Sequence, residues 1–235
     1  DSGNVLATGY LDYKVYRSTD NGATWDAGVL VAAGAGLSGI TQLSNGHVLA
    51  LGTLTNIVYR STDNGATWDA GVLVATGAGL SGITQLSNGT ILVTGNSSNK
   101  IYRSADNGTT WDAGTTIAGA NLTGVTQLAS GHVVAVDNAA NKIYRSLNNG
   151  YTWDAGSRVA LGAGIIGISQ LANGEVIASA TNGRIYKSTK LSAFVRIWYD
   201  QSGRNLQATQ ASVFLQPRIV NAGVIETSNG KPAVY

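Results

Sequence analysis

The chain has 235 residues; 12% of them are charged, about half the usual ~25%, and 31 are glycine. Its net charge of +2 is too small and too dispersed for a nucleic-acid-binding surface, and no apolar run reaches the roughly 18 residues of a membrane span. Cysteine is absent, which excludes disulfides and thiolate metal sites; methionine is absent too, so we expect a processed or partial product of a longer polypeptide.

A repeated octapeptide organises the first four fifths of the chain. Its copies span 18–25, 61–68, 104–111 and 146–153, so their closing tryptophans recur at spacings of 43, 43 and 42 residues. A fixed period of this length predicts a repeat architecture. Alignment on the tryptophans gives the units 1–35, 36–78, 79–120, 121–163 and 164–190, of which the first lacks the opening segment and the last ends before its tryptophan.

Each complete unit reads as four short strands. In the unit 36–78 we expect strands at 40–43, 47–51, 57–61 and 70–75, separated by Ser-Asn-Gly and Asp-Asn-Gly turns. Asn-Gly between β-rich runs is a hairpin signal, because both residues accept positive φ. Four antiparallel strands in about 43 residues match one propeller blade. The sequence therefore predicts an all-β fold, a β-propeller of about five four-stranded blades in 1–190 with a non-repeat C-terminal extension.

Residues 191–235 break the period and mark a domain boundary. Their motifs at 195–203, 208–210, 216–217 and 229–232 resemble the opening of a concanavalin-A-like lectin/glucanase (LamG-like) jelly roll of secreted bacterial and phage fibre proteins. A jelly roll needs eight strands, so it cannot be complete here. We expect either a longer parent chain or a segment that completes the propeller, with 196–199 as the fourth strand of the last unit and 218–220 or 233–235 as the first strand of the first unit.

The octapeptide resembles the Asp-box, or bacterial neuraminidase (BNR) repeat, Ser-x-Asp-x-Gly-x-Thr-Trp. Three copies match throughout, while the fourth has Asn for Asp. The resemblance implies a turn between the third and fourth strands of each blade. A short carboxylate can accept backbone N–H bonds in its own turn, and Trp can pack between blades. We expect these residues to be structural: Asp20, Gly22, Trp25, Asp63, Gly65, Trp68, Asp106, Gly108, Trp111, Asn148, Gly150 and Trp153.

The same resemblance raises the question of sialidase activity. Sialidases of this fold use an arginine triad, a Tyr nucleophile assisted by Glu, and an Asp acid. Here Arg17, Arg60, Arg103 and Arg145 are equivalent by repeat, and only Glu175 and Glu226 are glutamates. His47 and His132 share a repeat position with Thr90 and Glu175, which favours an exposed strand start over a metal ligand. We therefore expect no catalytic residue, no metal, no cofactor and no enzymatic activity.

The loops between the second and third strands vary most between units. We expect them to share one face with the connections between blades, and variation on a regular scaffold is where specificity is installed. The alternatives are polar loops without a ligand, or one site per blade lined by Gln42, Gln85, Gln127 and Gln170, for which we favour scaffold hydrogen bonding. The predicted ligand-binding residues are Tyr10, Asp12, Tyr13, Asn56, Asn96, Asn99, Asn138, Asn141 and Asn182.

These patterns favour a non-enzymatic recognition or structural module. We expect it to bind glycans or cell-surface polysaccharide, because amides, hydroxyls and Tyr rings suit sugar hydroxyls and ring faces. Its expected setting is extracellular, at a cell surface or on a virion, among other subunits or domains of a bacterial surface or phage fibre protein. The alternatives are a sialidase-like glycoside hydrolase fragment without its catalytic residues, or an architectural spacer.

Overall fold

The computed structural model describes residues 4–117 and 121–188, together with the backbone of strands β19 to β25 beyond residue 188. The chain forms two compact units, Asp1–Tyr186 and Lys187–Tyr235. All regular structure in the described residues is β, and no helix among them is long and apolar enough to cross a membrane.

The first unit consists of five antiparallel sheets, one for each sequence repeat. The first sheet contains β1 (Val5–Thr8), β2 (Lys14–Ser18) and β3 (Val29–Leu30). The second contains β4 (Leu37–Gln42), β5 (Val48–Gly52), β6 (Ile57–Ser61) and β7 (Val72–Leu73). The third contains β8 (Leu80–Gln85), β9 (Ile91–Gly95), β10 (Lys100–Ser104) and β11 (Thr115–Thr116).

The fourth sheet contains β12 (Leu122–Gln127), β13 (Val133–Asp137), β14 (Lys142–Ser146) and β15 (Ser157–Arg158). The fifth contains β16 (Ile165–Gln170), β17 (Val176–Ala180) and β18 (Ile185–Lys187). The architecture confirms the prediction of an all-β propeller with about five blades. The first sheet has no inner strand in the described residues, in agreement with the missing opening segment of unit 1–35.

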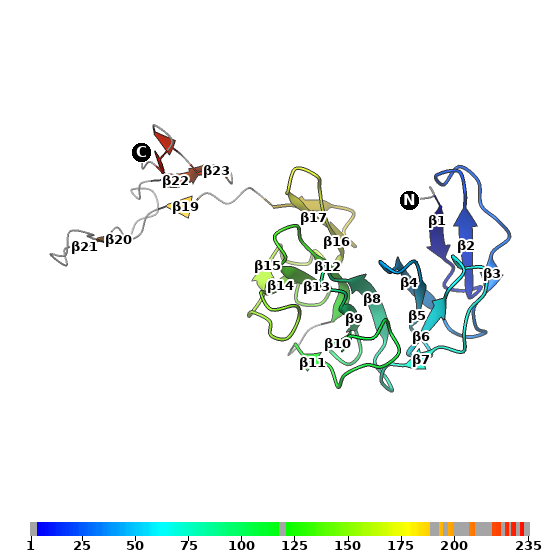
Figure 1. The fold of residues 1–235 in the computed structure, drawn as a ribbon. Helices are drawn as coiled ribbons and strands as arrows, with labels where there is room; N and C mark the ends of the chain where they lie inside the picture. The colour runs from blue at the N-terminus through cyan, green and yellow to red at the C-terminus, as the bar shows by residue number, and fades with distance from the viewer. Residues whose placement is uncertain are drawn as a thin grey trace. The chain divides into compact units, whose positions relative to one another are not determined.

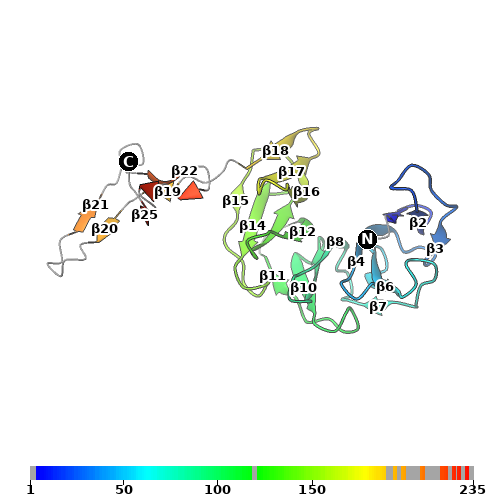
Figure 2. The same cartoon turned by 45° about the horizontal axis from the view of Figure 1, so that its top comes forward.

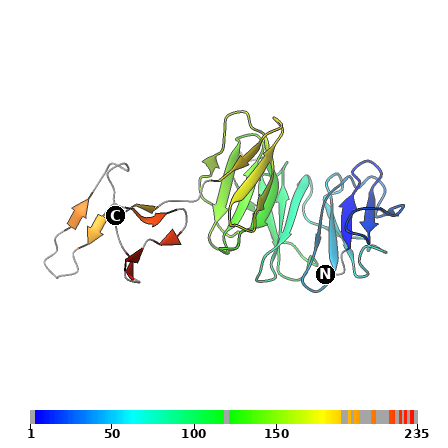
Figure 3. The same ribbon diagram turned by 90° about the horizontal axis from the view of Figure 1, so that it is seen from above.

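The sheets follow one another as blades along an arc (Figure 1). The first strand of each complete blade lies on the inner side of the arc and the fourth on the outer side (Figure 2), and successive sheets stack face to face (Figure 3). The fourth strands are shorter than the predicted 70–75, because Gly71 has φ +74° and pairing is restricted to Ile57 with Leu73 and Val58 with Val72.

The hydrophobic core lies between blades rather than within them. The second strands β5, β9 and β13 are buried along their whole length. Between the second and third blades, Leu49 and Leu51 of β5 pack with Leu80 of β8 and Tyr102 of β10. Because the second, third and fourth blades have a neighbour on both faces, their second strands read as near-continuous apolar runs.

Polar side chains also join neighbouring blades. The Gln85 side-chain oxygen accepts the Ser44 N–H of the preceding blade at 2.7 Å, and Gln127 and Gln170 repeat this bond with Ser87 and Ala129. These bonds confirm the scaffold interpretation for Gln85, Gln127 and Gln170, while Gln42 donates to the Gly46 carbonyl of its own blade.

Within the second unit, the described residues form short paired strands. Strand β20 (Ile197–Tyr199) pairs with β21 (Gln207–Thr209), and β19 (Ala193–Phe194) pairs with β22 (Arg218–Asn221). Strand β22 also pairs antiparallel with β23 (Val224–Ile225), and β24 (Thr227–Ser228) pairs with β25 (Lys231–Pro232). Residues 195–196 and 233–235 lie outside the described residues. Closure of the propeller by this segment stays a prediction.

Candidate functional site: the Asp-box turns and the loop face

Each Asp-box carboxylate is saturated by its own turn. Asp63 accepts the Thr67 backbone N–H at 2.8 Å, the Thr67 hydroxyl at 2.6 Å and the Ser61 hydroxyl at 2.7 Å. The Ser61 oxygen in turn accepts the Gly65 N–H at 2.8 Å. These hydrogen bonds, from Thr67 above all, lower the pKa of Asp63 to about 2, because they favour the charged form. The corresponding Thr bonds lower the pKa values of Asp20 and Asp106 to about 2 as well.

The fourth box keeps this geometry with an amide. The Asn148 oxygen accepts the Thr152 N–H at 2.9 Å, while its Nδ2 donates to the Thr152 hydroxyl at 2.9 Å. The bond to the hydroxyl is therefore reversed in polarity, but the turn closes in the same way. The Asn–Gly pairs inside the boxes have positive φ, for example +56° at Asn64 and +84° at Gly65, which explains the choice of these residues.

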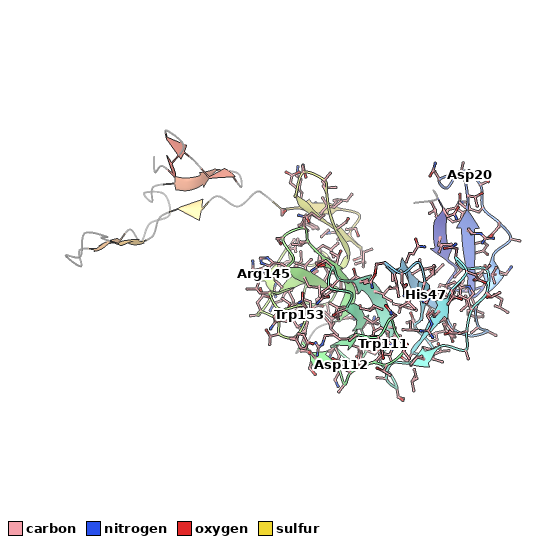
Figure 4. The ribbon with its side chains drawn as sticks, viewed as in Figure 1. Asp20, His47, Trp111, Asp112, Arg145 and Trp153 are labelled. Carbon is pink, nitrogen blue, oxygen red and sulfur yellow. The ribbon has the colours of Figure 1, made fainter. Side chains whose placement is uncertain are left out.

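The box tryptophans pack against the preceding blade. Trp68, Trp111 and Trp153 join the clusters between successive blades, whereas Trp25 of the first blade is 44% exposed. Figure 4 shows Trp111 and Trp153 on neighbouring blades, with Asp20 on the far side of the arc. The repeated acids thus lie on separate blades.

The repeated arginines are also part of the scaffold. The Arg17, Arg60, Arg103 and Arg145 backbone N–H groups donate to Asp26, Asp69, Asp112 and Asp154, and each side chain forms an ion pair with the same carboxylate. Arg103 additionally donates to the Gly150 carbonyl at 2.6 Å and lies 4.4 Å from the centre of the Tyr151 ring. It therefore ties the third blade to the fourth.

The loops between second and third strands share a face with the interblade connections, as predicted. Asn56 and Asn141 adopt φ values of +59° and +58°, and their side-chain oxygens accept the N–H groups of Gly79 and Gly164 in the following connection. Tyr13 and Asn99 occupy the same left-handed position. The role of these residues in ligand binding stays a prediction. The structure adds a turn-forming role that sequence reasoning did not assign.

Tyr10 and Leu54 are two exposed apolar side chains of this face, on which Leu11 is also exposed. They are 46% and 59% exposed, and a Cβ on Gly36 would lie 3.2 Å from the Tyr10 ring and 2.8 Å from Leu54. Both side chains therefore lie beside one glycine with φ +60°. The neighbouring Asp12 is exposed and accepts a hydrogen bond from Tyr16, which lowers the pKa of the Asp12 carboxyl.

The remaining predicted residues lie on the same face in later blades. Asn96 and Asn138 are half-buried, and their backbone N–H groups donate to Gly79 and Asn121 of the adjoining connection. Asn182 is exposed and donates to the Tyr186 hydroxyl at 2.9 Å. The structure thus spreads the nine predicted residues along all five loops rather than gathering them in one pocket.

Sequence reasoning missed a buried carboxylate in the fourth blade. Asp137 accepts N–H groups from Asn121, Ala139 and Ala140 with one oxygen and the Tyr144 hydroxyl with the other. Burial, with the Asp137 charge beside it, raises the pKa of Tyr144. The available signal was a departure from the repeat, because Gly9, Gly52 and Gly95 occupy this position in the first three blades.

The two histidines are half-buried rather than exposed, which corrects the expected exposed strand start. Each directly precedes a buried second strand, β5 or β13. Among the described residues, no three His, Asp or Glu side chains are close enough together to hold a metal ion.

Comparison with known proteins supports the repeat and the fold. The BNR/Asp-box repeat family matches residues 16–27 and 59–70. No curated protein matches the chain. Neither the BNR/Asp-box family match nor the similar solved structures support the resemblance of 191–235 to a LamG-like domain.

Among solved structures, selenomethionine-substituted virginiamycin B lyase from Staphylococcus aureus is 18% identical with a TM-score of 0.67, over 96% of this chain and 80% of the lyase. A catalytically inactive variant of that lyase with quinupristin is 20% identical with a TM-score of 0.65, over 80% of this chain and 67% of the lyase. YCF48 bound to D1 peptide is 14% identical with a TM-score of 0.60, over 80% of this chain and 60% of YCF48.

These similarities correct the expectation that the chain is not an enzyme. That expectation rested on the repeated carboxylates, which lie on separate blades and cannot meet in one active site. The propellers similar to this chain include a lyase, so the fold is enzyme-like, and catalytic groups can be carried by a few residues on such a scaffold without appearing in its repeat. The chain therefore carries BNR/Asp-box repeats on a five-bladed propeller fold of a kind that also occurs in enzymes.

Proposed function

We propose that the chain recognises glycans through its loop face, as part of a larger bacterial surface or phage fibre protein. The observation that carries the proposal is the exposed Tyr10 ring beside Leu54 and Gly36. A solvent-exposed aromatic ring near polar groups suits a sugar, because a sugar offers an apolar ring face and hydroxyl groups at its edges. Asp12, in the same loop as Tyr10, is exposed and supplies a carboxylate acceptor.

The composition of the chain supports the same ligand class. With 12% charged residues and a net charge of +2, the chain offers mainly neutral hydrogen-bonding groups. Such groups match uncharged polysaccharide better than a highly charged polymer. The extracellular setting, at a cell surface or on a virion, belongs to the same proposal.

Glycan-array binding by the full chain tests this function. Tyr10→Ala should weaken binding at least tenfold, because it removes the exposed ring and leaves the blade core intact. Tyr151→Ala is the matched control, since Tyr151 is 62% exposed but lies in an Asp-box turn.

Equal binding by Tyr10→Ala and the unmodified chain would exclude this face as the glycan site. Mass spectrometry of the bound glycans should accompany the array. Conversion of a bound glycan would show catalysis at the site, and an unchanged glycan would show recognition alone.

A further inference from the structure

A cavity of about 250 Å³ lies between the third and fourth blades, at their outer strands. The third blade lines it with Thr115 and Thr116 of β11. The fourth blade lines it with Lys142, Tyr144, Trp153 and Asp154. Aromatic and hydrogen-bonding groups of two blades therefore meet in one hollow.

The hydroxyl lining departs from the repeat. Val72 and Leu73 of the second blade occupy the positions of Thr115 and Thr116, and Val29 and Leu30 do so in the first. At the interface between the second and third blades, the four residues of the fourth blade have their equivalents in Lys100, Tyr102, Trp111 and Asp112. The third blade thus carries two hydroxyl side chains at positions where the first and second blades carry two apolar ones.

The polar groups keep capacity for a ligand. The Thr115 hydroxyl accepts from Arg103 at 3.0 Å, so its own O–H is still available to donate. Lys142 uses one ammonium N–H for the Ala155 carbonyl at 3.0 Å and has two more. One oxygen of Asp154 accepts backbone N–H groups of Arg145 and Gly156, while the other lies 3.8 Å from Arg145 Nε.

The aromatic groups are already satisfied. Trp153 is half-buried, and its Nε1 donates to the Gly150 carbonyl at 3.1 Å. The Tyr144 hydroxyl donates to Asp137 at 3.3 Å. Both rings can therefore contribute apolar surface to the cavity without leaving a polar atom unpaired.

We propose that this crevice binds one neutral, hydroxylated ring, such as a single sugar residue. The volume is below the ~300–1,000 Å³ of sites for drug-sized ligands, so it suits one ring. Asp154 pairs with Arg145, and Lys142 donates to the Ala155 carbonyl, so the lining holds one charge of each sign beside its hydroxyls rather than a cluster of like charges. The site is independent of the loop face and of the proposed function there.

Saturation-transfer NMR with neutral methyl glycosides on the full chain tests the proposal. In a ¹⁵N-labelled sample, the Trp153 indole N–H signal should shift with the bound glycoside, while that of Trp25 should not. The variant T115V/T116L should weaken binding at least tenfold. Its fold should be kept, because Val and Leu already occupy these positions in the second blade.

The reciprocal variant V72T/L73T is the matched control and should leave the Trp153 shift unchanged. Tyr10→Ala should leave it unchanged too, so that a failed loop-face proposal is distinguishable from a failed crevice. Absence of any glycoside-dependent Trp153 shift, or an equal shift in T115V/T116L, would overturn the proposal. Stronger binding of an anionic methyl uronide would contradict its neutral specificity.

Discussion

At the scale of single residues, the box acids hold backbone in place. Asp20, Asp63 and Asp106 each have a pKa near 2, below the ordinary 3.8, because Thr and Ser donors favour the carboxylate. A lowered folded-state pKa means that the stability gained is complete above about pH 4 and is lost as the pH falls toward 2. The melting temperature should therefore fall through this window.

The variant D20N/D63N/D106N should flatten that pH dependence. Asn148 shows that the amide closes the same turn, so the variant should stay folded at neutral pH. Thermal unfolding between pH 2 and 5 measures the effect. An unchanged acid transition in the triple variant would show that other carboxylates govern it.

Removal of the buried Asp137 carboxylate should lower the free energy of unfolding. Asp137→Gly restores the residue of the first three blades but leaves three N–H groups and the Tyr144 hydroxyl without their acceptor. Because the hydroxyl is buried and the three N–H groups are partly buried, we expect a loss of about 2–3 kcal/mol in urea unfolding. Tyr144→Phe, which removes one bond, should cost about 1 kcal/mol; similar losses in both variants would contradict this network.

At the scale of elements, the box hairpins of the second, third and fourth blades pack against the blade before them. The Gly108 position of the third blade faces Leu49 of the second, and Trp111 packs in the cluster between them. Trp111→Ala should lower the unfolding free energy by about 3 kcal/mol, in the range for buried aromatic truncations. Trp25→Ala should cost about 1 kcal/mol, because that ring is 44% exposed. Equal losses in urea titrations would show that Trp25 has a full packing partner.

At the scale of the whole molecule, the blades form a linear array. In such arrays stability comes largely from contacts between neighbours. Among the described residues, β8 and β12 each pack against first strands on both sides, whereas the first and fifth blades pack against one neighbour. Hydrogen exchange should therefore be slowest in β9 and β13 and faster in β1 and β17. Uniform protection across all five blades would indicate that the end blades have further partners.

The sequence by itself determined the repeat, the strand order and the role of the box residues. These follow from local chemistry: Asn-Gly accepts positive φ, Asp accepts the N–H groups of its own turn, and apolar runs must be buried. The regular spacing of the box tryptophans, such as Trp68 and Trp111, therefore sufficed to place a turn on each blade that carries a box.

Only the tertiary structure decided which polar residues meet across blades. The bond of Asn56 to Gly79, the contacts of Arg103 with Gly150 and Tyr151, and the crevice of Thr115 beside Trp153 each join residues of different repeats. Periodicity assigns equivalent positions but does not show which of them touch, because contact depends on how successive sheets stack.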